Sequence, residues 1–262
     1  MKHSLIAVDL DGTLLRNDGT LARRTARALS CASERGVKVV LSSGRMIRAV
    51  KPFHELAGLN TPIIGYNGAF IFNPSTEETL FHRPLERVDS DEVINFARKN
   101  QFHINAYSRD LCFSETADEF AQAYSGRYRV PVHLVKNLRE IEGEMTKLIV
   151  MSSSERFPVA WKVSSEAFGG RLYVTCSQNN YVEIMHPEVN KGMAVSLVAC
   201  RYGIPREEVV AIGDAPNDLE MFESAGLKVA VANADERVKK VADLVIPSNE
   251  EDGVASFVER ML

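Results

Sequence analysis

The chain has 262 residues, of which 45% are hydrophobic and 25% charged, and its formal net charge is −4. This length is enough for two domains with substantial cores, and the composition is typical of a folded globular protein. A small negative charge with interspersed signs argues against a polycationic surface for nucleic acid. The longest apolar runs fall far short of the roughly 20 residues that a membrane-spanning helix needs, and the N-terminus carries no signal-peptide pattern. We therefore expect a cytoplasmic protein with no nucleic-acid or membrane partner.

The residue types that usually bind zinc are scattered along the chain. The four cysteines, Cys31, Cys112, Cys176 and Cys200, form no Cys-x-x-Cys pair, and the six histidines include no His-Glu-x-x-His. We expect these thiols to be reduced and to be buried or partly buried. This pattern argues against zinc chemistry. The P-loop and dinucleotide-binding fingerprints are absent as well.

The first apolar run, over residues 4–8, ends at two aspartates, Asp9 and Asp11, and Gly12 follows them. So short a run of Leu, Ile and Val predicts a buried parallel strand. Side chains alternate along an extended strand, so Asp9 and Asp11 point to the same side. Their repulsion is costly unless a cation binds them or one of them holds a proton. An Asp-Gly pair is also common in ordinary turns, so this stretch by itself fits a turn and a site equally well.

Strand and helix patterns alternate in the N-terminal and C-terminal parts of the chain, which is typical of a doubly wound parallel sheet. Strands are predicted at 4–8, 37–41, 62–66, 209–212, 229–231 and 244–246. Helices are predicted at 20–35, 46–57, 190–202, 219–225, 235–242 and 254–261. Asn67-Gly68 predicts a hairpin between the apolar runs on either side of it. Pro52 predicts either a kink in its helix or a later start.

Between residues 83 and 186 the pattern changes to hairpins interleaved with helices. Helices are predicted at 90–100, 115–126 and 155–168, and strands at 102–107, 111–114, 130–135, 145–151, 172–176 and 181–185. This mixture predicts an α+β unit inserted into the α/β core. The expected domains are a discontinuous core, 1–82 with 187–262, and an inserted domain, 83–186.

Three predicted strands end in polar turns that contain glycine, at 9–12, 42–45 and 213–218. In an open parallel sheet such strand ends share one edge, where ligands bind. Asp9, Asp11, Asp214 and Asp218 would offer oxygen ligands without sulfur or imidazole, which is the preference of Mg²⁺. Since Mg²⁺ takes few carboxylates, not all of these aspartates can be direct ligands.

Two further positions would suit a phosphate group. Ser43 and Gly44 are expected at a helix start, where they would offer a hydroxyl and free backbone N–H groups. Lys191, at the opening of the helix over 190–202, would place a cation against the same anion. Each residue also has an ordinary explanation, Ser43 as a helix cap and Lys191 as a surface lysine. Their occurrence together with the aspartates favours a site.

The four motifs read Asp-Leu-Asp-Gly-Thr at 9–13, Ser-Ser-Gly-Arg at 42–45, Lys-Gly at 191–192 and Gly-Asp-Ala-Pro-Asn-Asp at 213–218. In their order, and in the insertion between the second and the third, the chain resembles the haloacid dehalogenase superfamily. It is most similar to the Cof-type phosphatases with a large inserted cap of type IIB. The resemblance covers essentially the whole chain, and the first and fourth motifs are specific to this superfamily. It implies a Rossmann-like core and a cap domain that closes over the site and selects the substrate.

The resemblance also implies a role for each motif residue. Asp9 would be the nucleophile that takes the phosphoryl group, and Asp11 the general acid/base. Mg²⁺ would be held by Asp9, the backbone carbonyl of Asp11 and Asp214, with Asp218 supporting these ligands. The residues that would contact the phosphate are Ser43, Gly44 and Lys191, with Asn217 and Asn67 as further candidates for phosphate or substrate contact. Lys191 would also offset the charge of Asp9.

The implied function is Mg²⁺-dependent hydrolysis of small phosphate monoesters through an aspartyl phosphate, by a monomer or a weak homodimer. Candidate substrates are sugar phosphates and phosphorylated cofactors such as pyridoxal phosphate and flavin mononucleotide. Three alternatives are a phosphosugar mutase with the same core, a phosphoacceptor switch like a receiver domain, and a non-catalytic ligand sensor. Asp11 argues against the switch and the sensor, because it is placed to hydrolyse the intermediate. The mutase stays open on sequence alone.

Overall fold

The computed structural model describes residues 3–178 and 180–262. Their contacts divide the chain into two compact units. We call the first the core unit; it comprises the segment that ends at Phe81 and the segment that starts at Asn190. The second, His82–Val189, is the inserted unit.

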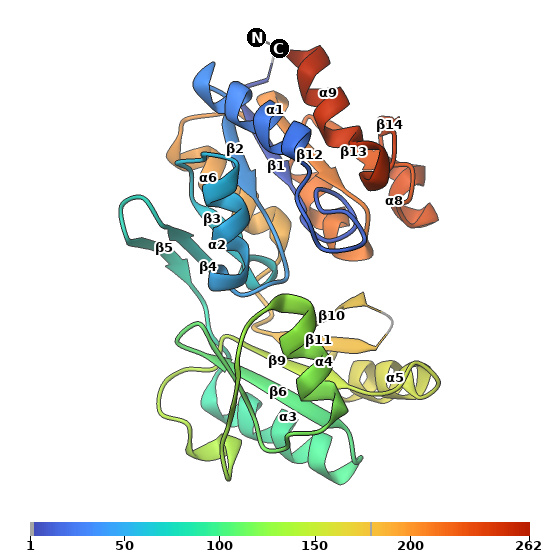
Figure 1. Ribbon diagram of the computed structural model, residues 1–262. Helices are drawn as coiled ribbons and strands as arrows, with labels where there is room; N and C mark the ends of the chain where they lie inside the picture. The colour runs from blue at the N-terminus through green and yellow to red at the C-terminus, as the bar shows by residue number, and fades with distance from the viewer. Residues whose placement is uncertain (1–2, 179) are drawn as a thin grey trace. The chain divides into compact units, whose positions relative to one another are not determined.

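The core unit is built on a five-stranded parallel sheet with the order β14-β13-β12-β1-β2 (Figure 1). Its strands are β1 Leu5–Val8, β2 Lys38–Leu41, β12 Val209–Gly213, β13 Leu227–Val231 and β14 Leu244–Ile246. Every residue of β1 and of β12 is buried, as expected for central strands covered on both faces. From β1 the chain moves outward to β2 and later returns to β12 on the other side, so the predicted doubly wound sheet is confirmed.

Helices lie between the strands of this sheet in chain order and after the last of them. They are α1 Arg23–Glu34, α2 Ile47–Leu56, α6 Lys191–Arg201, α7 Leu219–Glu223, α8 Glu236–Val241 and α9 Gly253–Met261, with short 3₁₀ turns η3 Arg206–Glu208, η4 Pro216–Asp218 and η5 Asn249–Glu251. Helices α1 and α9 lie side by side, and α6 packs against α7. Helix α2 begins at Ile47 and continues through Pro52, so the proline does not delay its start.

A small antiparallel sheet extends the core unit after α2. Its strands, in the order β3-β4-β5, are β3 Ile63–Gly65, β4 Phe70–Asn73 and β5 Glu78–His82. Strands β3 and β4 pair with Ile63 opposite Phe72 and Gly65 opposite Phe70. The hairpin predicted at Asn67-Gly68 is therefore present, and the 3₁₀ turn η1, Tyr66–Gly68, connects its strands.

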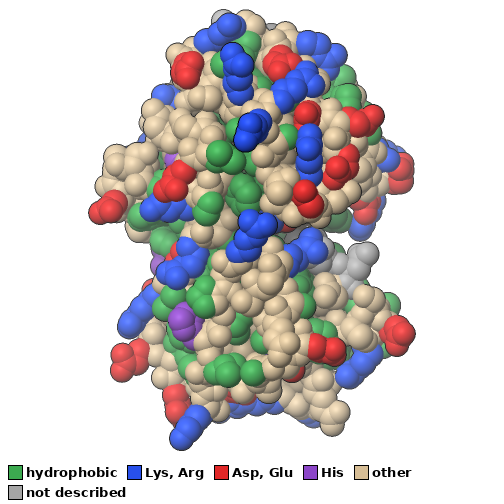
Figure 2. Space-filling view, in the orientation of Figure 1, with side chains coloured by type: hydrophobic (Ala, Val, Ile, Leu, Met, Phe, Trp, Pro, Cys, Tyr) green, Lys and Arg blue, Asp and Glu red, His purple; other side chains and the backbone are tan. Residues whose placement is uncertain are grey.

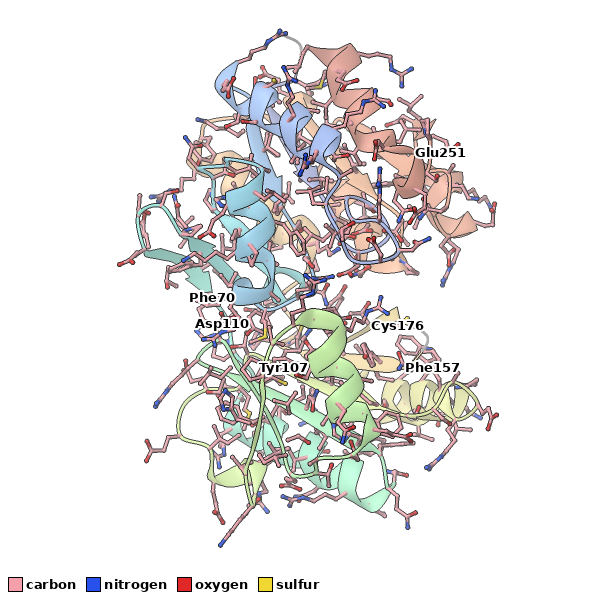
Figure 3. All side chains as sticks on the ribbon, viewed as in Figure 1. Phe70, Tyr107, Asp110, Phe157, Cys176 and Glu251 are labelled. Carbon is pink, nitrogen blue, oxygen red and sulfur yellow. The ribbon has the colours of Figure 1, made fainter. Side chains whose placement is uncertain are left out.

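The inserted unit has a six-stranded sheet with the order β10-β11-β9-β6-β7-β8. Its strands are β6 His103–Ser108, β7 Leu111–Ser114, β8 Val132–Leu134, β9 Lys147–Met151, β10 Tyr173–Gln178 and β11 Tyr181–Met185. Its helices are α3 Arg87–Lys99, α4 Glu119–Tyr128, α5 Phe157–Phe168 and the 3₁₀ turn η2 Leu138–Glu140. An apolar core that includes Val93, Leu148 and Phe168 joins α3 and α5 to the sheet. Tyr107 of β6 instead contacts the ring of Tyr124 on α4 (Figure 3). The predicted α+β character is confirmed.

Three features of the structure bear on the predictions from composition. Within 3–178 and 180–262, no helix combines the length and the apolar character that crossing a membrane requires. Figure 2 shows Lys and Arg interspersed with Asp and Glu on the face in view. The expectation that all four cysteines are at least partly buried is wrong for Cys200, which is exposed on α6.

Candidate active site

The three polar turns of the core sheet lie at one level because their strands are in register. Val8 of β1 is paired with Leu41 of β2 on one side and with Ile212 of β12 on the other. The residues that follow these three are therefore neighbours at the carboxyl edge of the sheet. The backbone N–H of Asp9 donates to the carbonyl of Ile212 at 2.9 Å, which fixes the start of the first turn.

Lys191 connects the first turn to the fourth motif. Its Nζ donates to Oδ1 of Asp9 at 2.5 Å and to Oδ1 of Asp218 at 2.6 Å. The Lys191 side chain is only 1% exposed, so this is a buried cation held between two carboxylates. The sequence had also allowed Lys191 to be a surface lysine, and its burial excludes that reading. Because Lys191 is the first residue of α6, the helix start sets its position.

Asp218 organises the loop after β12. Its Oδ2 accepts from the backbone N–H groups of Asp214 and Ala215 at 2.9 and 3.0 Å, while its Oδ1 accepts from Lys191. Both oxygens are thus engaged and the residue is fully buried. A carboxylate with these partners supports the loop and the lysine.

Asp214 is oriented by a residue to which the sequence assigned no role. The hydroxyl of Thr13 donates to Oδ1 of Asp214 at 2.5 Å. Gly12 lies against the same carboxylate: a Cβ added there would come within 2.5 Å of Oδ2, and its φ of +82° disfavours any other residue. The Asp-Gly-Thr sequence of the first turn therefore shapes the position of Asp214.

Three carboxylates at this edge could hold a cation. Ligand oxygens of Asp9, Asp214 and Asp218 all lie within 4.8 Å of one another. If all three are ionised they carry three negative charges, which Lys191 offsets by one, so a divalent cation would balance the remainder. Among the residues that the structure describes, the second oxygens of Asp9 and Asp214 accept no hydrogen bond. Hard oxygen donors with excess negative charge fit Mg²⁺.

The charges of this cluster perturb one another strongly. Burial, with Asp218 and Asp214 nearby, raises the pKa of Asp9 well above its usual value even though Lys191 opposes this. Burial and the charge of Asp218 raise the pKa of Asp214 to about 7. Burial alone would lower the pKa of Lys191, but Asp218 and Asp9 outweigh it and raise that pKa. The lysine thus stays charged, and the cluster gains from any further positive charge.

Asp11 is held by an arginine of the second motif for which the sequence predicted no role. Arg45 donates from Nε to Oδ2 of Asp11 at 2.7 Å and from Nη2 to Oδ1 at 2.6 Å. Its side chain is 7% exposed, against 23% for Asp11, and its guanidinium lies over the ring of Phe53 at 5.5 Å. This is a bidentate, partly buried ion pair between the first and second motifs. Its sequence signal is an arginine directly after Ser-Gly at a strand end.

The expectation for Ser43 and Gly44 needs a correction. Helix α2 begins only at Ile47, so these residues precede the helix instead of starting it. The Ser43 N–H is also not free, because it donates to the carbonyl of Ile64 at 2.9 Å, and the Arg45 N–H donates to Oγ of Ser43 at 3.1 Å. Before α2 begins, the chain passes close to β3, and the hydrogen bonds formed there occupy the backbone N–H groups of Ser43 and Arg45. The hydroxyl proton of Ser43 remains as a donor.

Asn67 and Asn217, 150 positions apart, form a pair. Nδ2 of Asn217 donates to Oδ1 of Asn67 at 2.9 Å. Asn67 is fully buried and Asn217 is 3% exposed. The structure thus brings Asn67 to the fourth motif.

The chain was compared with known proteins. The model of the haloacid dehalogenase-like hydrolase family matches residues 6–258. The 5-amino-6-(5-phospho-D-ribitylamino)uracil phosphatase YitU of Bacillus subtilis is 30% identical over 266 residues, which cover 98% of this chain and 97% of that protein. The pyridoxal phosphate phosphatase YbhA of Escherichia coli is 28% identical and covers 98% of each chain. A haloacid dehalogenase-like hydrolase from Bacteroides thetaiotaomicron shares the fold with a TM-score of 0.91, at 29% identity over 100% of both chains.

The fold and these comparisons define a class: the chain belongs to the haloacid dehalogenase-like hydrolase family. Within that family it is a phosphatase of the Cof type, an enzyme that hydrolyses phosphate monoesters.

Proposed function

We propose that the protein is a Mg²⁺-dependent phosphatase that hydrolyses small-molecule phosphate monoesters through an aspartyl phosphate on Asp9. The observation that carries this proposal is the state of the Asp9 carboxylate. Lys191 holds Oδ1, and Oδ2 accepts no hydrogen bond from any residue that the structure describes. One oxygen is therefore anchored while the other is available as a nucleophile.

Asp9 would attack the phosphorus atom with its unanchored oxygen, and the ester oxygen would leave on the opposite side. The new O–P bond forms as the bond to the leaving group breaks, and Asp11 gives that oxygen a proton. In the second step Asp11 takes a proton from water, which attacks the aspartyl phosphate and releases inorganic phosphate and free Asp9. Phosphoryl transfer mainly needs such in-line positioning together with neutralised charge.

Arg45 would set the position of Asp11 in both steps. Its two hydrogen bonds engage both oxygens of the ionised Asp11 carboxylate, the form that accepts a proton from water. A protonated Asp11 needs one oxygen for its proton, so it would give up one of the two bonds when it acts as the acid. We propose Arg45 as a positioning residue that keeps Asp11 aligned through this exchange.

The phosphate group would meet positive charge and donors from the chain. Lys191 has three N–H donors and uses two on Asp9 and Asp218, which leaves one for a phosphate oxygen. The Ser43 hydroxyl would supply another, beside Gly44. Mg²⁺ would be held by Asp9, the backbone carbonyl of Asp11 and Asp214, with Asp218 supporting them. When bound, the ion would supply charge neutralisation for the transferring phosphoryl group.

The substrate proposed is a small phosphorylated metabolite, either a sugar phosphate or a phosphorylated cofactor such as pyridoxal phosphate or flavin mononucleotide. Two relatives are named for a ribitylaminouracil phosphate and for pyridoxal phosphate, which supports this class. Their names also favour a phosphatase over a mutase, a switch or a sensor. We further propose that the inserted domain, 83–186, is the cap that selects the substrate. The cytoplasmic location and the monomeric or weakly dimeric state stay predictions from the sequence.

The test is phosphate release from a panel of sugar phosphates, nucleotides, pyridoxal phosphate and flavin mononucleotide, with Mg²⁺ and with excess chelator. We expect release that depends on Mg²⁺ and that is absent in Asp9→Asn, with the folded state of the variant unchanged by circular dichroism. Release at the normal rate in Asp9→Asn would overturn the assignment of the nucleophile. No release from any ester by the unmutated protein would count against the proposed reaction.

A further inference from the structure

Helices α1 and α9 of the core unit lie side by side (Figure 1) and border a pocket of about 670 Å³. Pockets that bind small molecules in proteins have volumes of about 300–1,000 Å³. The charged part of the lining consists of four arginines of α1 and its C-cap, Arg23, Arg24, Arg27 and Arg35, together with Glu259 of α9. None of the lining residues belongs to the four motifs of the candidate active site. The pocket is therefore a separate feature of the core unit.

Two of these arginines have no partner within the chain. Arg24 donates from Nε and Nη2 to the two oxygens of Glu259 at 3.1 and 2.6 Å, so the charges of this pair cancel. Arg23 and Arg27, in contrast, make no hydrogen bond or ion pair with any residue of 3–178 and 180–262. Both side chains are exposed. Each guanidinium group thus keeps its five N–H donors for a ligand.

The placement of these positive charges is unfavourable unless an anion is bound. Arg23 and Arg27 are four residues apart on α1, and Arg24 and Arg27 are three apart, so the side chains of each pair are neighbours on the helix and repel one another. The first turn of α1 contains no acidic residue that would offset them. The chain as a whole has a formal net charge of −4, so this concentration of positive charge is local. An anion held between Arg23 and Arg27 would relieve the repulsion.

The chemistry of the lining favours an organic phosphate as that anion. A guanidinium group presents two parallel N–H donors that match two phosphate oxygens. A phosphate monoester carries a charge of about −1.5 to −2 at pH 7, which two unpaired arginines balance. One helical turn beyond Arg27, about 6 Å along the axis, the lining changes to Cys31, with Ala28 beside it and Leu262 after α9. The ligand would therefore combine a phosphate group with an apolar carbon skeleton.

We propose that the pocket between α1 and α9 binds a small organic phosphate, with the phosphate group between Arg23 and Arg27 and the carbon skeleton against Ala28 and Cys31. This binding site goes beyond the proposed function, because it includes none of the four motifs and needs no divalent cation. The carboxylate side chain in the lining is engaged on both oxygens by its arginine partner, so it supplies no free nucleophile. The ligand would be bound there without being hydrolysed.

The test is calorimetric titration with phenyl phosphate and with inorganic phosphate, in about 0.15 M NaCl and excess chelator. The chelator prevents Mg²⁺-dependent turnover, so the result does not depend on whether the phosphatase reaction is found. The double variant Arg23→Gln, Arg27→Gln removes both charges, and glutamine favours a helix about as well as arginine does, so α1 should stay folded by circular dichroism. The control double variant Arg171→Gln, Arg201→Gln removes the same charge from exposed arginines outside the pocket.

We expect phenyl phosphate to bind the unmutated protein with a dissociation constant below about 1 mM. Inorganic phosphate should bind at least about ten-fold more weakly, because it has no ring to bury. The pocket double variant should weaken phenyl phosphate binding by at least about ten-fold, and the control double variant should leave it within about two-fold. No saturable binding of phenyl phosphate, or equal effects of the two double variants, would overturn the proposal. Equal affinities for the two probes would overturn the role of the apolar part of the lining.

Discussion

Arg45→Lys tests whether the bidentate ion pair to Asp11 positions a proton donor. Lysine keeps the positive charge but presents a compact ammonium in place of the planar fork, so it can replace only one of the bonds at 2.7 and 2.6 Å. A hydrogen bond to a charged group contributes about 1.5–3 kcal/mol. Asp11 is 23% exposed, which moderates the loss through water. If this free energy is lost from the alignment of Asp11 in the transition state, the rate falls by about ten- to a hundred-fold.

The assay compares two leaving groups, because only one of them needs the acid. A sugar alkoxide needs a proton as it leaves, whereas 4-nitrophenolate leaves without one. The ratio kcat/KM reports the steps up to phosphoryl transfer, so the later attack of water does not enter. We expect Arg45→Lys to lower kcat/KM for the sugar phosphate by about ten- to a hundred-fold and for 4-nitrophenyl phosphate by less than about three-fold.

Two controls define the result that would refute this reasoning. In an Asp11→Asn background Arg45→Lys should have no further effect, since its partner is already inactive. Arg24→Lys alters a bidentate pair with Glu259 on the surface of the same unit and should leave both substrates unaffected. Equal losses for the two leaving groups, or an undiminished loss in the Asp11→Asn background, would show that Arg45 acts on the phosphate instead of on Asp11.

Two further predictions concern packing and thiol chemistry. A Cβ at Gly192 would come within 2.1 Å of the Glu220 carbonyl oxygen, so we expect Gly192→Ala to destabilise the protein by about 1–3 kcal/mol in urea unfolding. Gly126→Ala, in open space on α4, should instead be stabilising by up to about 1 kcal/mol, and equal effects of the two would contradict the packing argument. Burial raises the pKa of Cys112 to about 12, so at pH 8 its thiol is protonated. Iodoacetamide should therefore modify exposed Cys200 and spare Cys112 in the native protein, as mass spectrometry can show, and early labelling of Cys112 would contradict its burial.

The sequence alone determined the fold class and indicated the main acidic residues of the candidate site. A buried parallel strand appears in the sequence as a short apolar run, and an abrupt change to polar residues and glycine marks its end. The residues next to Asp9 and Asp214 are therefore enough to predict that both lie at strand ends. The common edge of the sheet follows from the alternation of strands and helices. The register of Val8 between Leu41 and Ile212 then brings these ends together as that reasoning requires.

Only the tertiary structure decided which of these residues touch. The pairs Arg45–Asp11 and Thr13–Asp214 join different motifs, and the pair Asn217–Asn67 joins the fourth motif to the turn after β3. The residues next to each of these side chains in the sequence do not indicate its partner. The same holds for Ser43, whose N–H is taken by Ile64 before α2 begins. Local patterns report burial and periodicity, which depend on neighbours in sequence. A hydrogen bond across 150 residues depends on how strands register and on where each side chain then points, and these are properties of the folded chain as a whole.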